Sequence, residues 1–370
     1  MSHNKSIPMI DLPRVHAAYQ SELDAAIDGV VRSGSYIGGP AVVGFQERLT
    51  TYLQTPAFGV GNGTDSLILS MKAMGIGPGD EVITAPNSYL ASASSIELIG
   101  ATVVFADVRD DFNLDPIEVQ KKITSKTKAI IAVHLTGRPA AMDEILAIAK
   151  KHDLFVIEDA AQAVGATYKG RPVGSIGDMA SFSLHPLKNL SAIGDAGMIT
   201  TNNEAYYNYL LKARSHGHIS RDECEFWSMN SRIDALQAAI LNIKILRLPE
   251  WTNRRRAIAK KYINSFGHLV EVPQEKDYEK SVYHTFIIKT NRRDELKDYL
   301  QNKGIDTKIH YPIPIHKQKA AKDNLSANDS YPVTESQVKR ILSIPVYPKL
   351  TDEQVDYICE SVNNFFNHDS

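Results

Sequence analysis

The feature that most constrains the fold is a regular alternation of short apolar runs with helical segments between residues 58 and 201. The apolar runs cover residues 81–85, 103–108, 129–134, 154–159, 180–184 and 197–201. They are apolar on both faces, which is typical of buried parallel strands. Helices are expected between most of them, at residues 65–74, 90–99, 116–123 and 142–152. This pattern predicts an α/β fold, a large domain with a mostly parallel central sheet flanked by helices.

The pattern differs on either side of this region. An amphipathic helix is expected before it at residues 19–33, and a second helical stretch at 41–53. The elements expected after about residue 250 are helices at 254–266, 292–303 and 351–366, a strand at 282–290 and a proline- and histidine-rich loop at 308–320. We expect residues 1–250, N-terminal helix included, to form the large domain, and residues 251–370 to form a smaller C-terminal α+β domain. The sequence leaves open which domain the N-terminal helix packs against.

The composition excludes several classes of function. The chain of 370 residues has 41 basic and 43 acidic side chains, which gives a formal charge of −2. It therefore lacks the excess of positive charge that binding to nucleic acid or to an anionic membrane requires. The two cysteines, Cys224 and Cys359, form no CxxC or Cys/His cluster, so we expect no metal site. No run approaches the roughly 20 apolar residues of a membrane span, and the N-terminus lacks the apolar region of a signal peptide. We expect a soluble, cytoplasmic protein.

In open α/β sheets ligands bind beyond the carboxyl ends of the strands, so the residues there are the candidates for chemistry. The stretch GNGTDS at 61–66 places small residues before a helix, whose free N–H groups can hold a phosphate. An ordinary N-cap by Thr64 or Asp65 is the alternative. The carboxylate of Asp65 would repel a phosphate, so Asp65 fits only if it caps the helix or contacts the ligand through its backbone N–H.

Two acids, Glu158 and Asp159, close the strand at 154–159. Adjacent strand residues face opposite ways, so only one of them can point into a given site. A carboxylate at the end of a buried strand needs a cation or several hydrogen-bond donors. It is therefore either an N-cap for the next helix or the partner of a protonated ring nitrogen.

Lys188 follows the strand at 180–184, in a turn of small residues and proline. It is either a surface lysine or, if held near other cations or in an apolar pocket, an amine that loses its proton and becomes a nucleophile. A phosphate cradle, an acid for a ring nitrogen and a lysine for a Schiff base are the parts that a protein supplies to pyridoxal 5'-phosphate. The order and spacing of these parts favour this cofactor.

The sequence resembles a family of sugar-nucleotide aminotransferases, often called the DegT family, which has the aspartate aminotransferase fold (fold type I). The resemblance runs nearly from end to end of the chain. The motifs that carry it are GNGTDSL (61–67), GIGPGDEVI (75–83), VIEDAAQAVGA (156–166), SFSLHPLKNL (181–190), NSRIDALQAAI (230–240) and HYPIPIH (310–316).

The resemblance implies a role for each residue that matches a family motif. Lys188 would form the Schiff base and move protons, Asp159 would hold the pyridinium proton and Gln162 would reach the phenolic oxygen. Tyr89 would stack on the ring. The phosphate would be bound by Ser183 and by the start of the helix at Gly63, Thr64 and Asp65, with Asn230 reaching across a dimer interface. The protein is therefore expected to be at least a homodimer with shared active sites.

The substrate contacts implied by the resemblance are Tyr36, Arg232, His310, Tyr311 and His316. For the two histidines a structural role in the proline-rich loop is an equal alternative. Arg232 could instead pair with Asp234 of its own chain. His134 and His185 are expected to be packing or supporting residues rather than catalysts.

The resemblance implies a pyridoxal-phosphate aminotransferase with ping-pong kinetics. It would move an amino group from L-glutamate to a keto-deoxy sugar nucleotide, dTDP- or UDP-linked, with a 3-keto sugar slightly favoured over a 4-keto sugar. Two alternatives stay open. One is a sugar dehydratase that uses the same cofactor, although that branch has histidine in place of the lysine. The other is a regulatory or binding homologue without catalysis.

Overall fold

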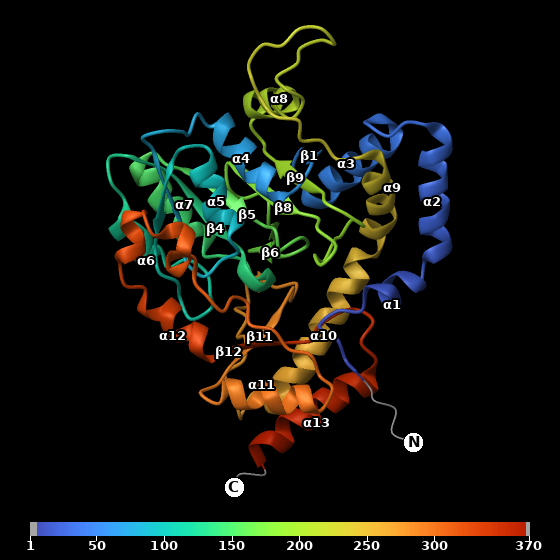
Figure 1. The fold of residues 1–370 in the computed structure, drawn as a ribbon, viewed down its shortest axis with the longest axis vertical. Helices are drawn as coiled ribbons and strands as arrows, with labels where there is room; N and C mark the ends of the chain where they lie inside the picture. Colours follow the sequence, from blue (N-terminus) through green and yellow to red (C-terminus); the bar gives the residue numbers. More distant parts are fainter. Residues whose placement is uncertain (1–5, 368–370) are drawn as a thin grey trace.

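The computed structural model describes residues 6–367, apart from the side chains of Leu325 and Ala327. Its centre is a seven-stranded sheet with the order β1-β9-β8-β5-β4-β2-β3 (Figure 1). All of its strands are parallel except β9, which runs antiparallel to both of its neighbours. The strands are β1 (Ala57–Val60), β2 (Glu81–Thr84), β3 (Thr102–Phe105), β4 (Thr127–Val133), β5 (Phe155–Asp159), β8 (Met179–Ser183) and β9 (Gly197–Thr200). The predicted α/β fold with a mostly parallel sheet is confirmed.

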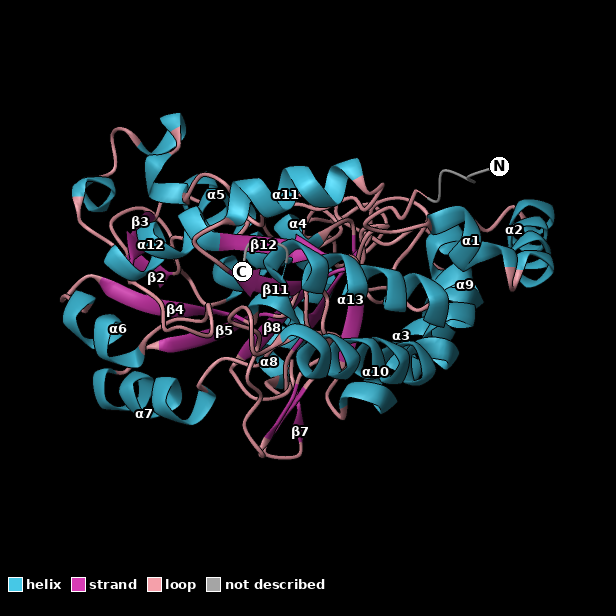
Figure 2. Cartoon of the chain, turned by 90° about the horizontal axis from the view of Figure 1, so that it is seen from below, coloured by secondary structure: helices cyan, strands magenta, loops and turns pink. Residues whose placement is uncertain are grey.

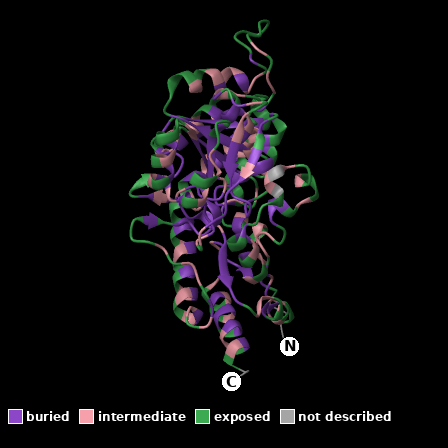
Figure 3. Cartoon of the chain, turned by 90° about the vertical axis from the view of Figure 1, so that its left-hand side faces the viewer, coloured by how far each residue is buried: buried purple, intermediate pink, exposed green. Residues whose placement is uncertain are grey.

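Helices cover both faces of this sheet, and Figure 3 shows the buried strands enclosed by helices with exposed outer surfaces. Ile131 and Ile157 face a core with α4 (Gly63–Ala73), α5 (Ala91–Leu98) and α8 (Glu204–Ala213). Their neighbours Ile130 and Val156 face the opposite core, with α6 (Pro116–Lys122) and α7 (Met142–His152). Because successive side chains of a strand point to opposite faces, a strand between two helical layers must be apolar at every position.

Two features of the sheet differ from the expectation. β1 is a four-residue edge strand in a stretch to which the sequence pattern assigns no element. β9 is antiparallel because the chain returns from β8 through residues 184–196 without a crossover helix, which a parallel connection needs. That helix-free return carries Lys188.

The open question of the N-terminal helix is answered by its contacts. α2 (Gln20–Ser33) and α3 (Gly39–Leu53) pack against α9 (Ala235–Lys244), with Leu23 and Ile240 in one buried cluster. Ahead of them comes the short helix α1 (Leu12–Ala17). The segment before α1 takes another path, because Ile7 pairs with Ile305 and is buried among C-terminal residues. The two ends of the chain therefore share a core.

The C-terminal part is built on α10 (Leu248–Phe266), which packs against α13 (Asp352–Asn367) (Figure 2). Its two-stranded antiparallel sheet consists of β11 (Phe286–Lys289) and β12 (Ile341–Ile344), with α11 (Arg293–Asn302) and α12 (Pro332–Arg340) beside it. A small sheet of two-residue strands joins β10 (Glu279–Lys280), β6 (Thr167–Tyr168) and β7 (Arg171–Pro172). α12 and β12 lie in stretches to which the sequence analysis assigned no element. The division of the chain near residue 250 stays a prediction.

Two absences concern the described residues alone. No helix within 6–367 combines the length and the apolar character that crossing a bilayer requires. The same residues contain no cluster of histidine, cysteine and acidic side chains arranged to hold a metal ion.

The close contact between Gly197 of β9 and the residue before α4 can be tested by substitution. A Cβ on Gly197 would lie 2.3 Å from the carbonyl carbon and oxygen of Asn62, directly before α4. We expect Gly197→Ala to lower the free energy of unfolding by about 1–3 kcal/mol, because backbone must move to admit the methyl group. Gly29→Ala is the matched control, since no atom lies within 4 Å of that position. Urea unfolding measures both, and a Gly197→Ala protein as stable as the wild type would contradict the packing.

Candidate active site

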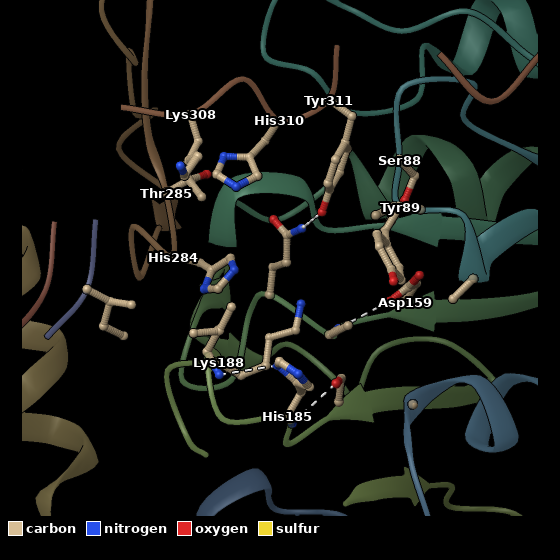
Figure 4. A pocket seen from close by; sticks show the side chains of 18 of the residues that line it. Ser88, Tyr89, Asp159, His185, Lys188, His284, Thr285, Lys308, His310 and Tyr311 are labelled. Atoms are coloured by element: carbon tan, nitrogen blue, oxygen red, sulfur yellow. Dashed lines mark hydrogen bonds between the residues drawn. The ribbon is translucent and has the colours of Figure 1, made fainter. Parts of the chain in front are cut away.

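One cavity of about 930 Å³ opens at the carboxyl ends of the strands, between the sheet and the C-terminal part (Figure 4). Most of the residues that the sequence assigned to a cofactor or substrate converge here. Those that line it are Gly63, Thr64, Asp65, Tyr89, Asp159, Gln162, Ser183, Lys188, His310 and Tyr311. They come from the start of α4, the segment between β2 and α5, the ends of β5 and β8, the turns that follow β5 and β8, and the loop after residue 307.

The two acids at the end of β5 have different environments. Glu158 is fully buried on the far face, where His134 Nε2 donates to it at 3.0 Å and the N–H groups of Gly174, Ile176 and Gly177 donate at 2.7–2.9 Å. Burial alone would raise the pKa of the Glu158 carboxyl, but the hydrogen bonds from His134 and the backbone outweigh it and hold the pKa below its ordinary value. Glu158 is therefore a structural anchor, and the expectation that His134 supports rather than reacts agrees with this contact.

Asp159 is the acid that faces the cavity. Its Oδ2 accepts from Ser92 Oγ at 2.8 Å and its Oδ1 from the backbone N–H of Ala161 at 3.2 Å. These two donors fix the orientation of the carboxylate at the carboxyl edge of the sheet. A cationic group bound in the cavity would find this carboxylate already oriented.

Lys188 lies between Asp159 and His284 in the cavity (Figure 4). Its backbone N–H donates to the carbonyl of His185 at 2.8 Å, so a tight turn presents the side chain. Burial lowers the pKa of the Lys188 amine to about 8, against the opposing effect of the Asp159 carboxylate. The alternative of an ordinary surface lysine is excluded by this position, since the amine is held in a cavity opposite a carboxylate.

The start of α4 forms a narrow cradle beside these groups. The N-cap is Asn62, whose Oδ1 accepts from the N–H of Asp65 at 2.9 Å; the alternative of a cap by Thr64 or Asp65 is wrong. The carboxylate of Asp65 accepts from Ser231 Oγ at 2.7 Å. A Cβ on Gly63 would lie 2.9 Å from the Cβ of Ser183, so only glycine allows the helix start to approach the end of β8 this closely.

Two polar residues complete this side of the cavity. Gln162 accepts from the N–H of Thr136 at 2.8 Å and donates to the hydroxyl of Tyr311 at 3.3 Å. Tyr89 is exposed at the mouth, with its ring 5.8 Å from that of Tyr311. Both rings are therefore placed to contact a planar ligand.

Four of the expected site residues do not line the cavity of this chain. Tyr36, Asn230 and Arg232 are exposed on its surface, and the described ion pairs do not join Arg232 to Asp234. Residues 214–234, which include Asn230 and Arg232, connect α8 to α9, and part of this segment projects beyond α8 in Figure 1. The fourth residue, His316, is buried and shares a contact of 3.1 Å with Glu335. This favours the structural alternative for His316.

His310 does line the cavity, and its Nδ1 contacts Ser343 Oγ at 2.8 Å. Burial, with Lys188 and Lys308 nearby, lowers its pKa to about 4, so the imidazole is neutral near pH 7. His185, expected to support or pack, is exposed and also lines the cavity.

Several lining residues escaped the sequence analysis. They are Pro8, Met9, Ile10, Ser88, Arg255, His284, Thr285, Asp306 and Lys308. Most of these lie far from the strand ends in sequence, where no motif marks them. They reach the cavity because the N-terminal segment and the C-terminal part fold against each other.

The fold and this site define the class of aminotransferases in which a lysine and a carboxylate face each other at the carboxyl edge of the sheet. The chain belongs to the DegT/DnrJ/EryC1/StrS aminotransferase family, whose model matches residues 18–363. This confirms the family that the motifs indicate.

Individual relatives match over almost the whole chain. A protein of Geobacillus stearothermophilus named as a pleiotropic regulatory protein is 40% identical, over 98% of this chain and 99% of its own. The dTDP-3-amino-3,6-dideoxy-alpha-D-galactopyranose transaminase of Aneurinibacillus thermoaerophilus is 42% identical, over 97% of this chain and 99% of its own.

Two solved structures are similar in fold. DesV of S. venezuelae, in complex with a ketimine intermediate, has a TM-score of 0.95 and 38% identity, over 97% of this chain and 98% of that one. NtdA of Bacillus subtilis, with its bound cofactor PMP, has a TM-score of 0.93 and 29% identity, over 98% of this chain and 85% of that one. A relative of the same fold thus holds the aminated form of the expected cofactor.

Substitution of the two adjacent acids should affect the stability of the protein very differently. Glu158→Ala leaves one imidazole and three backbone N–H groups without an acceptor, so we expect the free energy of unfolding to fall by about 3–5 kcal/mol. Asp159→Asn should keep the stability within about 1 kcal/mol, since an amide oxygen can still accept a hydrogen bond. Urea unfolding of both variants measures the difference; equal losses would contradict the distinct roles.

At acid pH the difference in the free energy of unfolding between the wild type and Glu158→Ala should become smaller. The folded-state pKa of Glu158 lies below its ordinary value of 4.5, so its stabilisation is complete above that pH. The stabilisation is lost as the pH falls through the folded value. A gap that stays constant from pH 7 to pH 3 would contradict this.

Proposed function

We propose that this protein is a pyridoxal-phosphate aminotransferase that moves an amino group from L-glutamate to a keto-deoxy sugar nucleotide. The observation that carries the proposal is the cavity amine of Lys188, held opposite the oriented carboxylate of Asp159 and beside a helix start. An amine, a carboxylate and a phosphate cradle are the groups by which proteins hold this cofactor.

The residues present fit the cofactor. Gly63 brings the start of α4 against Ser183, so the N–H groups of Gly63 and Thr64 and the Ser183 hydroxyl could bind one phosphate together. Asp159 suits a protonated ring nitrogen because both of its oxygens are already fixed by donors. The Gln162 amide, which contacts Tyr311, is placed for a phenolic oxygen, and Tyr89 for stacking on the ring.

When bound, pyridoxal phosphate supplies an electron sink for the carbon from which a proton is removed. The residues of the protein bind the cofactor and transfer the proton. Lys188 Nζ is the group that takes and returns the proton, and a pKa near 8 lets the amine exist in both forms near neutral pH. With the cofactor bound, Asp159 would hold the proton of the ring nitrogen, and the N–H groups of α4 together with Ser183 would hold the phosphate.

The name of a close relative supports the substrate class. The Aneurinibacillus enzyme is named for a dTDP-linked sugar with its amino group on carbon 3. We therefore favour a 3-keto sugar over a 4-keto sugar, on a dTDP or UDP carrier. The product would be an amino-deoxy sugar for a surface polysaccharide or a glycosylated metabolite.

Two other functions are less well supported. A sugar dehydratase of the related branch would not need Lys188, which this chain retains. The relative named as a pleiotropic regulatory protein raises a regulatory role. A pure binding protein gains nothing from an amine whose pKa is lowered by burial opposite a carboxylate.

Spectroscopy tests the donor half of the reaction. The protein with pyridoxal phosphate should be yellow, and excess L-glutamate should convert the band to that of the pyridoxamine form with release of 2-oxoglutarate. Lys188→Ala should lose turnover by a factor of roughly 10³ or more, because the proton-transfer group is gone. A yellow band unmoved by glutamate would exclude glutamate as the donor, and a Lys188→Ala protein with full turnover would exclude the role of Lys188.

The proposed homodimer is tested by mixing two inactive variants. If Asn230 reaches the phosphate of the neighbouring subunit, a heterodimer of Lys188→Ala and Asn230→Ala contains one site with both residues intact. Activity should then reappear after the two proteins are mixed and allowed to exchange subunits. No recovery in confirmed heterodimers would show that Asn230 does not serve the partner's site.

A further inference from the structure

Asp65 is a residue of the GNGTDS motif whose negative charge opposes the proposed phosphate site. It lines the cavity as the third residue of α4. On sequence grounds it fits there only if it caps the helix or contacts the ligand through its backbone N–H. The structure meets neither condition, because Asn62 is the cap and its Oδ1 accepts from the N–H of Asp65 at 2.9 Å. Whether Asp65 fits beside a phosphate therefore depends on what holds its carboxylate.

The Asp65 carboxylate is held by Ser231, a residue distant in the sequence. Ser231 Oγ donates to Asp65 Oδ2 at 2.7 Å and accepts from the backbone N–H of Gly61 at 2.9 Å. The hydrogen of the hydroxyl is thereby committed to the carboxylate. Ser231 is 2% exposed, so bulk water does not compete for this contact.

Ser231 is itself fixed by the segment that connects α8 to α9. Its backbone N–H donates to the carbonyl of Arg214 at 2.8 Å, and Arg214 Nη1 donates to the carbonyl of Gly59 at 2.8 Å. Gly61 leaves space for the contact, because a Cβ there would lie 3.2 Å from both Asp65 Oδ2 and Ser231 Oγ. The hydroxyl is therefore part of a fixed link between this segment and the start of α4.

Without that hydroxyl the carboxylate would find other donors in the first turn of α4. In the described part of the chain, no protein acceptor is hydrogen-bonded to the N–H of Gly63 or Thr64. An acid at the third position of a helix can turn back toward the N–H groups at its start, as in a capping box. A carboxylate in that position would compete with a phosphate for these donors and repel its negative charge.

We propose that Ser231 is a positioning residue for the phosphate site: its hydroxyl holds the Asp65 carboxylate and so leaves the N–H groups of Gly63 and Thr64 free for the anion. The inference rests on the proposed function only in taking the start of α4 as the phosphate site. It gives the segment between α8 and α9 a role in the active site of its own chain.

A double-mutant cycle tests the contact through the affinity for inorganic phosphate. Ser231→Ala should weaken phosphate binding by roughly 5- to 10-fold, because the charge of Asp65 is released toward the site. Asp65→Asn removes that charge, so its phosphate affinity should equal or exceed that of the wild type. Ser231→Ala added to Asp65→Asn should then change the affinity less than about twofold, because the interaction between the two sites is already gone.

Ser66→Ala is the matched control. It also removes a buried hydroxyl next to the start of α4, but this hydroxyl donates to the carbonyl of Met198 at 2.6 Å and makes no contact with Asp65. Its phosphate affinity should stay at the wild-type value.

The measurement is the thermal unfolding of the full-length, cofactor-free protein in increasing concentrations of inorganic phosphate at constant ionic strength. A ligand that binds only the folded protein raises its stability by an amount set by the ratio of ligand concentration to Kd, so weak binding can be measured. Each variant is compared with its own unfolding midpoint without phosphate, which removes the effect of the substitution on stability alone. The same proteins are titrated with pyridoxal phosphate in parallel.

Several results would overturn the proposal. Equal phosphate affinity of Ser231→Ala and the wild type would mean that the hydroxyl does not control the charge of Asp65. The same loss in the Asp65→Asn background would mean that the hydroxyl acts through Gly61 or the neighbouring Asn230 instead. An equal loss in Ser66→Ala would mean that general packing of α4 is what matters, and a wild-type protein that binds no phosphate would remove the site itself.

The proposed function fails in a different way. A protein that shows the expected cycle with inorganic phosphate but takes up no pyridoxal phosphate would remove the proposed function and leave the role of Ser231 standing. Uptake of pyridoxal phosphate with no effect of Ser231→Ala on either ligand would do the reverse.

Discussion

The burial of one amine opposite one carboxylate is the constraint on which the rest of this structure depends. Lys188 loses hydration in the cavity, which lowers the pKa of its amine to about 8. The negative charge of Asp159 acts in the opposite direction and raises this pKa. An amine in this position needs a rigid turn beneath it and a carboxylate that cannot swing away. The turn is closed by the hydrogen bond from Lys188 N to His185 O, and the carboxylate is held by Ser92 and Ala161.

The sheet topology places these groups together. β5 and β8 are parallel neighbours, so Asp159 and Ser181 are paired at the same edge. The chain then returns as antiparallel β9 instead of crossing over through a helix. The loop of the return stays at the carboxyl edge and brings Lys188 over the ends of the strands. Gly197 of β9 lies against the start of α4, so the same return packs against the phosphate cradle.

Much of the fold and the central site could be predicted from the sequence, because both depend on local patterns. Strands apolar on both faces and a lysine after a strand are visible in the chain itself. Strand geometry alone narrows Glu158 and Asp159 to one inward-facing residue, and the family resemblance selects Asp159. The structure adds the reason, because donors from residues 174–177 hold Glu158 on the opposite face. Asn62 was missed as the N-cap because three neighbouring side chains could each serve. Arg255 on α10 and His284 just before β11 lie outside the large sheet, and only the folding of the C-terminal part against that sheet brings them to the cavity.

The most direct test of the central role of Lys188 is to reduce the pyridoxal-phosphate-loaded protein with borohydride and map the modified residue by mass spectrometry. The account predicts a single phosphopyridoxyl group on the peptide that contains Lys188. Its absence from a protein pretreated with the aminated cofactor would show that the link is specific. A label on another lysine, or none at all, would contradict the account, because the amine opposite Asp159 would then not be the one that holds the cofactor.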